Sequence, residues 1–468
     1  AAREAYAAAR RADDRPLQAR SLQAAGDAAL AQGHAVDALD AAEEALELFR
    51  DLRQEQGAAG ALATVIGARL ASAEPSGALR AAKAAHERAR GLGSAEGEAL
   101  ALLAVAGVCV HVRAPREAMQ ALAGACGLFR QLKDKKKEAE TLTMAINAHL
   151  MMGEVAEAAR AGKQARAAFR EARDHRGEAG VLEVLVQIHI AENEPNEALD
   201  ALNGMARALE ALGESEELAK VRLQAAGLHL QKEDCAGALE AAARAADAWE
   251  LAGGPGEEAR ARHVMAQAHL MRFNHLSDPV GGGATEGQPP IEQAREAVAA
   301  ARRARALFRQ ATDLEGETGA VQTASRASLA AGDVREAARL AEEALQLARR
   351  AHDRQSEGAA QYLCAQMFAA QDRMAPAIRA AQAARELFQE HRDGENAALA
   401  AELLEALCEE QQLRGLSQNA QGRWVDERGA AQGSHRQGAD GPRQLKEKEL
   451  ATLYNRTAFP WTLTQAEA

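Results

Sequence analysis

The chain has 468 residues, a formal net charge of -12 and only 3% aromatic residues. An acidic balance argues against a nucleic-acid partner, and the lack of an apolar run of about 18 residues or a signal peptide argues against membrane insertion and secretion. Five cysteines without C-x-x-C spacing favour buried thiols in a reducing, cytoplasmic setting over disulfides or a metal site.

A fixed period of forty residues runs through most of the chain. A bulky or small apolar residue marks it at Phe49, Ala89, Phe129, Phe169, Leu209, Trp249 and, after one nineteen-residue slip, Phe308, Ala348 and Phe388. An alanine keeps the same period eleven residues earlier, at Ala38, Ala78, Ala118, Ala158, Ala198, Ala238, Ala297, Ala337 and Ala377. Such a period is typical of a repeat array, in which each unit buries its apolar face against its neighbours.

The chain begins inside a repeat. Ala5 falls in the column of Ala45, which belongs to the second half of a unit, and the first residue is not methionine. We therefore expect a fragment or a processed product.

Each unit is expected to be a helical hairpin, because two segments with helical apolar spacing flank a short break. The break carries Gly33, Gly153 and Gly332, which suit the left-handed residue that ends a helix. Pro75, Pro115 and Pro195 suit the first turn of the helix that follows. A charged turn closes each unit and is marked by Gly57, Gly97, Gly177 and Gly316.

Several residues carry a family resemblance. Leu22, Gly26, Gly33, Ala38 and Ala45 fall at the spacings of the tetratricopeptide repeat (TPR). The forty-residue period and the charged turn resemble the longer repeats of the Pins/LGN and kinesin light chain families. This resemblance implies an all-α fold, a right-handed α-solenoid (superhelix) of about nine TPR-like hairpins plus a capping helix, over residues 1–414.

In the family that the chain resembles, the first helices line a concave groove that binds a peptide or helix from a partner protein. Carried over by position, one column of groove residues is Asp27, Asn147, Gln187, Gln267, Arg326 and Gln366. A second column is Arg20, Glu140, Lys220 and Arg260. A third column is Gln23, Thr143, Glu183, His263, Gln322 and Tyr362. Side-chain amides can both donate to and accept from a peptide backbone.

Four histidines form a further column in successive first helices, at His149, His189, His229 and His269. They are tempting metal ligands, but neighbouring first helices lie about 10 Å apart and zinc ligands must lie much closer together. We expect these histidines to pack between the helices of a hairpin. The basic cluster of Lys133 and Lys135 to Lys137 is interpreted as a solvated surface.

The regular period is interrupted twice. Residues 274–292 form an expected flexible insertion loop, rich in glycine and proline, within the seventh unit. After a capping helix at about 394–414, residues 415–444 are expected to be a disordered linker, and residues 445–468 a short helix and an aromatic tail. One hypothesis is that this tail contacts the groove of its own chain or a partner; the alternative is a terminus packed on the cap.

No P-loop, nucleophile elbow, zinc-protease or calcium-loop motif occurs in the sequence, and no cofactor is expected. The sequence predicts a non-catalytic scaffold that binds partner proteins. An alternative is the sensing region of a larger signalling protein or enzyme whose catalytic domain lies elsewhere. A third hypothesis, catalysis by the histidine column, has the least support.

Overall fold

The computed structural model describes residues 2–277, 290–414, 417–418 and 424–425. It divides into two compact units, residues 1–214 and 215–468. The first unit contains α1 (Ala2–Arg11), α2 (Arg15–Ala31), α3 (Ala35–Asp51), α4 (Glu55–Ala71), α5 (Pro75–Gly91), α6 (Ala95–His111), α7 (Pro115–Leu132), α8 (Lys135–Met151), α9 (Val155–Glu171), α10 (His175–Ala191) and α11 (Pro195–Leu212).

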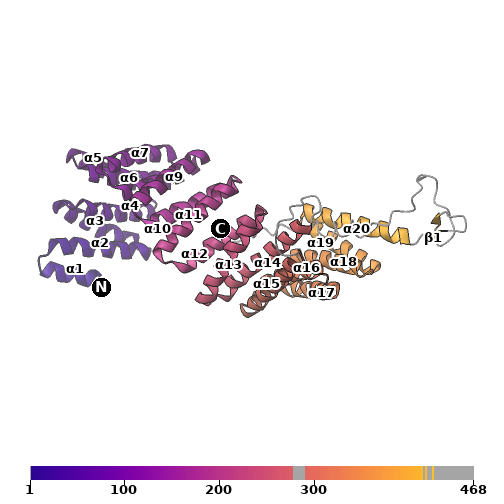
Figure 1. Ribbon diagram of the computed structural model, residues 1–468. Coiled ribbons are helices and arrows are strands. Elements are labelled where there is room, and N and C mark those ends of the chain that lie inside the picture. The colour runs from indigo at the N-terminus through magenta and orange to yellow at the C-terminus, as the bar shows by residue number, and fades with distance from the viewer. Residues whose placement is uncertain (1, 278–289, 415–416, 419–423, 426–468) are drawn as a thin grey trace. The chain divides into compact units, whose positions relative to one another are not determined.

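The second unit contains α12 (Ser215–Gln231), α13 (Cys235–Ala252), α14 (Pro255–Ser277), α15 (Pro290–Gln310), α16 (Leu314–Ala330), α17 (Val334–Ala351), α18 (Arg354–Ala370), α19 (Met374–Glu390), α20 (Gly394–Arg414), β1 (Ser417–Gln418) and β2 (Trp424–Val425). From α2 to α19, each even-numbered helix packs with the odd-numbered helix that follows it (Figure 1). The described residues thus form nine complete hairpins, which confirms the predicted all-α array of TPR-like repeats.

The turns between helices follow a shorter period than the sequence indicated. A left-handed residue, with φ between 52° and 86°, recurs every twenty residues, so the turn within a hairpin and the turn between hairpins share one geometry. These residues are Asp13, Gly33, Arg53, Ala73, Gly93, Arg113, Lys133, Gly153, Arg173, Asn193, Gly213, Glu233, Gly253 and, after the slip, Thr312, Gly332, His352, Asp372 and Arg392. Twelve of them are not glycine, which is why glycine alone did not reveal the period.

The glycines that mark the charged turn allow close packing of an aromatic ring. Gly177 lies in the first turn of α10, not at the left-handed position, and a Cβ there would collide with the ring of Phe169. Gly57 and Gly316 stand in the same relation to Phe49 and Phe308. Glycine is therefore needed because the aromatic column packs against the backbone of the next helix.

The repeat position that follows this glycine holds a buried glutamate in several repeats, also where the glycine itself is replaced. Glu178 is 5% exposed and receives hydrogen bonds from Arg170, eight residues earlier, at 2.7 Å for Nη2. The same spacing joins Arg130 to Glu138, Arg309 to Glu317 and Arg349 to Glu357. Each arginine is more than half exposed, so removing the arginine leaves a buried carboxylate without this partner, whereas removing the glutamate leaves only an exposed charge.

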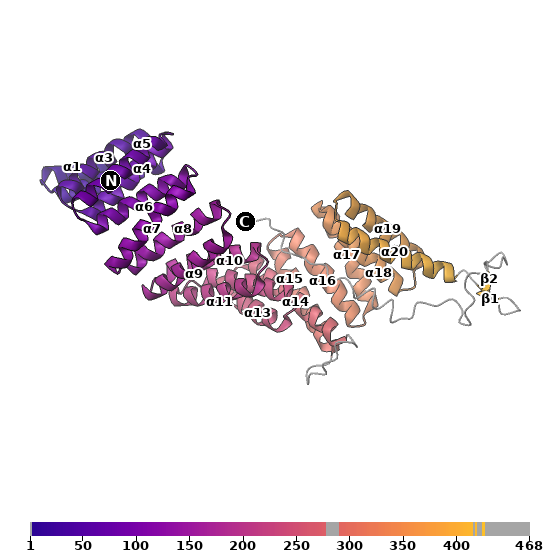
Figure 2. The same ribbon diagram turned by 90° about the horizontal axis from the view of Figure 1, so that it is seen from above.

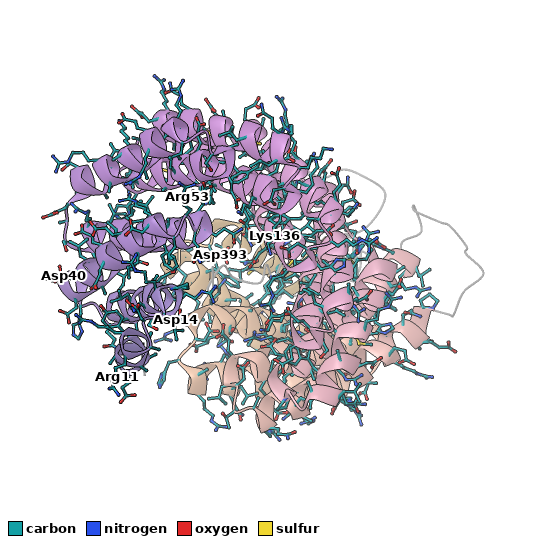
Figure 3. All side chains as sticks on the ribbon, turned by 90° about the vertical axis from the view of Figure 1, so that its left-hand side faces the viewer. Arg11, Asp14, Asp40, Arg53, Lys136 and Asp393 are labelled. Atoms are coloured by element: carbon teal, nitrogen blue, oxygen red, sulfur yellow. The ribbon has the colours of Figure 1, made fainter. Side chains whose placement is uncertain are left out.

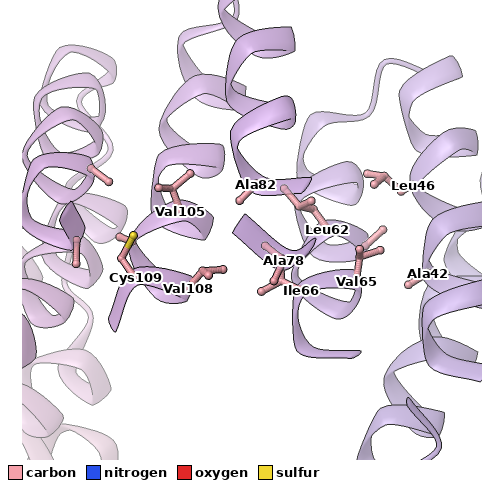
Figure 4. Close-up of a cluster of buried hydrophobic side chains, with 14 of the residues drawn as sticks. Ala42, Leu46, Leu62, Val65, Ile66, Ala78, Ala82, Val105, Val108 and Cys109 are labelled. Carbon is pink, nitrogen blue, oxygen red and sulfur yellow. The ribbon is translucent and has the colours of Figure 1, made fainter. Parts of the chain in front are cut away.

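The core consists of small contacts repeated along the array. All nine members of the alanine column are fully buried, and Phe49, Phe129, Phe308 and Phe388 are at most 2% exposed. Figure 4 shows part of this core in the first unit, where Leu62, Val65 and Ile66 of α4 lie between alanines of α3 and α5. Both columns are therefore packing positions, as predicted.

The first helices of successive hairpins pack against one another. In the first unit the contacts join α2 to α4, α4 to α6, α6 to α8 and α8 to α10, and in the second unit α12 to α14, α14 to α16 and α16 to α18. No two successive second helices pack comparably among the described helices. The first helices therefore line the inner side of each unit, and the second helices form the outer side, where Figure 3 shows Asp40 of α3.

The structure differs in part from the predicted interruptions of the period. Helix α14 continues to Ser277 and α15 begins at Pro290, so both ends of the predicted 274–292 loop are helical, and 278–289 lie outside the described residues (Figure 2). The capping helix is confirmed as α20. The predicted disordered linker contains an antiparallel pair, with Ser417 opposite Val425 and Gln418 opposite Trp424. Its remaining residues and the 445–468 tail lie outside the described residues.

Candidate functional site

The predicted groove residues of the first unit are mostly accessible. Arg20, Asp27, Glu140, Asn147, Glu183 and Gln187 are exposed, whereas Gln23 and Thr143 are partly buried. The amides of Asn147 on α8 and Gln187 on α10 lie at equivalent positions of successive first helices. The inner side of this unit therefore presents polar side chains to solvent.

Some of these residues are already engaged within the fold. The side chain of Gln23 lies over Gly60 of α4, where a Cβ would collide with it. Asp27 accepts a hydrogen bond from the hydroxyl of Thr64, and the Thr143 hydroxyl donates to the carbonyl of Ala139 at 3.0 Å. Their polar groups are therefore less available to a ligand than those of Asn147 and Gln187.

Aliphatic side chains accompany the two exposed amides. Leu150 lies three residues after Asn147 and is 38% exposed, and Ile190 lies three residues after Gln187 and is 45% exposed. Residues three apart lie on the same face of a helix. Each of these two helices thus presents one amide and one aliphatic group.

The inner side of the second unit differs. Lys220 and Arg260 are exposed and pair with Glu217 at 2.8 Å and Glu257 at 3.2 Å on their own helices. The other candidates, from α14, α16 and α18, are partly or fully buried: His263, Gln267, Gln322, Arg326, Tyr362 and Gln366. We call these six residues the inner polar cluster.

Hydrogen bonds connect parts of the inner polar cluster to neighbouring helices. The ring Nε2 of His263 lies 2.9 Å from the Thr323 hydroxyl and 3.5 Å from Nε2 of Gln267. Gln322 donates from Nε2 to the carbonyl of Ser356 at 3.1 Å. Sequence reasoning missed Thr323 and Ser356, because neither falls in a predicted groove column.

Burial changes the acid–base behaviour of this cluster. Burial, together with the positive charge of Arg326, lowers the pKa of His263 to about 4. Burial also lowers the pKa of Arg326 to about 10 and raises that of Tyr362 to about 12. At neutral pH the cluster therefore contains a neutral imidazole, a cationic guanidinium and a neutral phenol.

The histidine column packs at the turn within the hairpin, as expected. Nδ1 of His149 lies 2.8 Å from Glu154, that of His189 2.7 Å from Glu194, and that of His229 2.8 Å from Asp234. Each acidic partner is the residue that precedes the second helix. His269 instead lies 3.0 Å from Gln293 Oε1 on α15. These histidines connect the two helices of a hairpin.

The lysine cluster lies at the surface, as predicted, and three of its members form ion pairs. Lys135 pairs with Glu138 and Glu171 at 3.1 Å, and Lys136 pairs with Asp174 at 2.8 Å. Lys137 pairs with Glu96 at 3.0 Å. These three lysines thus link neighbouring turns at the solvated surface.

The described residues contain no group of three or more His, Cys, Asp or Glu side chains placed to hold a metal ion. The five cysteines are free thiols, and burial raises the pKa of Cys364 to about 12. Within residues 2–277 and 290–414, every helix is too short or too polar to span a lipid bilayer.

No protein-family model matches the chain. No curated protein matches it. Among solved structures, it is similar to a signal transduction ATPase with numerous domains (STAND) that has a tetratricopeptide repeat sensor, from Pyrococcus horikoshii. The identity is 13% and the TM-score 0.45, over 79% of this chain and 54% of that one. The chain thus spans about half the length of the STAND protein.

Two further solved structures are similar to the chain. A tetratricopeptide repeat protein from Parabacteroides merdae is 15% identical, with a TM-score of 0.34, over 66% of this chain and 97% of that one. The apo form of the quorum sensor NprR from B. thuringiensis is 11% identical, with a TM-score of 0.37, over 79% and 98%. At these values the similarities carry no inference about function, and the TPR-like description stands on the hairpins of this chain.

Proposed function

We propose that this chain is a non-catalytic interaction scaffold that binds a peptide or helix of a partner protein on the inner side of its first helices. The observation that carries the proposal is the repeated pair of an exposed amide and an exposed aliphatic side chain on α8 and α10, formed by Asn147 with Leu150 and Gln187 with Ile190.

The chemistry of these pairs suits a peptide. An amide can donate to a backbone carbonyl and accept from a backbone N–H, while the aliphatic group gains from the removal of water. Packed helices lie about 8–10 Å apart, and an extended chain rises about 3.3 Å per residue. An extended peptide that crosses the two helices would therefore meet one amide and one aliphatic group about every three residues.

The test is affinity capture from cell extract with the full chain, followed by titration of the purified chain with the captured protein. The variant Asn147→Ala/Gln187→Ala/Leu150→Ser/Ile190→Ser removes both kinds of contact without touching a buried residue. We expect it to weaken binding at least about tenfold, because each lost contact contributes on the order of 1 kcal/mol.

The matched control is Arg160→Ala/Lys163→Ala on α9, which removes exposed charges from a second helix of the same hairpin region. This control should bind as the unchanged chain does. Undiminished binding by the quadruple variant would exclude the inner side of α8 and α10 as the site. The alternative, a sensing region of a larger signalling protein, stays a prediction.

A further inference from the structure

A pocket of about 340 Å³ lies on the side of the second helices, between α15 and α17 of the second unit. Four arginines and one glutamate supply its charged lining: Arg302, Arg305, Arg309, Arg339 and Glu336. Ala324 of α16 and Leu340 of α17 also line it, and both side chains are nearly fully buried. We call this the arginine pocket, and it lies apart from the inner polar cluster.

The arginines are held in place by three carboxylates. Arg302 bonds Glu336 at 3.2 Å, and Arg339 bonds both Glu336 at 2.8 Å and Glu343 at 3.2 Å. Arg305 bonds Glu343 and, at 3.4 Å, Glu317, which also pairs with Arg309. Four guanidinium groups against three carboxylates leave the network with one excess positive charge, in a chain whose net charge is -12.

Hydrogen-bonding capacity remains in the pocket. A guanidinium has five N–H donors. Towards the described residues, Arg302 uses one of them, Arg305 and Arg309 use two each, and Arg339 uses three. The carboxylates therefore orient the arginines but leave donors for an added oxyanion.

The hairpin itself does not require this arrangement. In the first unit, Arg166 and Arg170 occupy the positions of Arg305 and Arg309 and pair with Glu178 in the same way. There, however, Asp200 stands at the position of Arg339, and Gly204 at that of Glu343. Lys163 stands at the position of Arg302. The Arg–Glu pair at the turn is thus common to both units, whereas Arg339 and Glu343 are an addition.

We propose that the arginine pocket binds a phosphate monoester. A phosphate group offers three oxygens to donors from different directions, and planar guanidinium forks match phosphate geometry. A single carboxylate would engage one fork only, whereas this pocket brings four together. The phosphate can belong to a phosphorylated side chain of a partner or to a small phosphorylated molecule, since both present the same group.

The experiment is calorimetric titration of the full chain at pH 7.5 and constant ionic strength with two probes. One probe is inorganic phosphate, and the other is a short peptide with one phosphoserine, compared with its unphosphorylated form. Both probes should bind with saturation, and the unphosphorylated peptide should not. Tighter binding of the phosphopeptide than of inorganic phosphate assigns the phosphate to a protein partner, and equal binding assigns it to a small molecule.

Two variants change the pocket in opposite directions. Arg302→Gln/Arg339→Gln alters two arginines that are 58% exposed and should weaken phosphate binding at least about tenfold. Glu336→Gln removes a competing carboxylate and should strengthen binding. A control, Arg160→Gln, removes a comparable exposed arginine that pairs with Glu157 three residues away on α9, and it should have no effect.

Absence of saturable phosphate binding by the unchanged chain would overturn the proposal. So would equal affinity in the double variant and the unchanged chain, provided that circular dichroism shows both to be folded. A loss in Arg160→Gln as large as that in the double variant would reduce the effect to general charge attraction and would also overturn it.

Discussion

The inner sides of the two units carry the same columns of predicted groove residues with opposite outcomes. In the first unit, Asn147 and Gln187 are exposed to solvent. In the second unit, the equivalent Gln366 is 2% exposed, and Gln267 lies against His263. The position of a residue in the repeat therefore decides which side of the helix it occupies, but the neighbouring helix decides whether water reaches it.

In both units, a polar side chain of one first helix lies against a glycine of the next first helix. Gln23 lies over Gly60 of the next first helix, and His263 lies against Gly319, where a Cβ would stand 3.2 Å from its ring. The two pairs occupy equivalent repeat positions. A threonine at one repeat position adds a hydrogen bond in both units, from Thr64 to Asp27 and between Thr323 and His263, whereas farther along the first unit exposed residues take over on α8 and α10. A glycine on the facing helix thus lets a polar side chain turn inward.

The largest expected effect tests this difference directly. Tyr362→Ala should lower the free energy of unfolding of the second unit by about 3–5 kcal/mol, because it empties a fully buried aromatic site. Asn147→Ala should change stability by no more than about 0.5 kcal/mol. Urea denaturation combined with hydrogen exchange would assign each loss to its unit.

Tyr362→Phe is the control, since it keeps the ring and removes only the hydroxyl that bonds Gln366. Its cost should be about 1 kcal/mol. If Asn147→Ala and Tyr362→Ala proved equally costly, the contrast between an exposed and a buried inner side would be wrong.

An intermediate effect concerns pH. His263 has a folded-state pKa of about 4 against an ordinary value of 6.5, so the unfolded chain binds its proton first as the pH falls. The stability that the neutral imidazole contributes is present above pH 6.5 and is lost between pH 6.5 and about 4. The loss should reach at most about 3 kcal/mol.

The measurement is the difference in unfolding free energy between the unchanged chain and His263→Gln from pH 7.5 to 4. In this difference, the contributions of the carboxylates that titrate in both proteins cancel. Parallel curves would show that His263 contributes no pH dependence.

The smallest effect tests what the units have in common. Arg173 in the first unit and Arg392 in the second are exposed and left-handed, with φ of 55° and 58°. Replacing either with glycine removes the backbone strain of the left-handed conformation, about 1–2 kcal/mol. The greater conformational entropy of glycine in the unfolded chain offsets about 0.5–1 kcal/mol of this. The free energy of unfolding of each variant should rise by up to about 1 kcal/mol, and the two increases should be equal.

Thermal melting of both variants would measure these gains. Gly153→Ala should destabilise the first unit by a similar amount, because it places a Cβ at a left-handed position with φ of 75°. Unequal gains at Arg173 and Arg392 would show that the twenty-residue turn is not energetically equivalent in the two units.

Much of the fold could be predicted because its signals are local. The buried alanine column, the aromatic column and the helix starts at Pro75, Pro115 and Pro195 all depend on residues within one hairpin. The role of Gly177 could not be predicted in the same way, because its reason is the ring of Phe169 on the preceding helix. Most of the left-handed residues were also hidden, since any exposed side chain is tolerated there at modest cost.

The candidate site was predictable only as a set of positions. By itself, the sequence determined the repeat period, the helical hairpins and the columns that face the inner side, because these follow from helical spacing and turn chemistry. Only the tertiary structure decided that Asn147 meets water while Tyr362 does not, that the chain divides into two units, and that the arginines at 302 and 339 meet in one pocket. The physical reason is that exposure, burial of charge and pocket formation depend on how closely neighbouring helices approach. That distance is set by contacts between different helices, such as those of Arg302 with Glu336 and of His263 with Thr323.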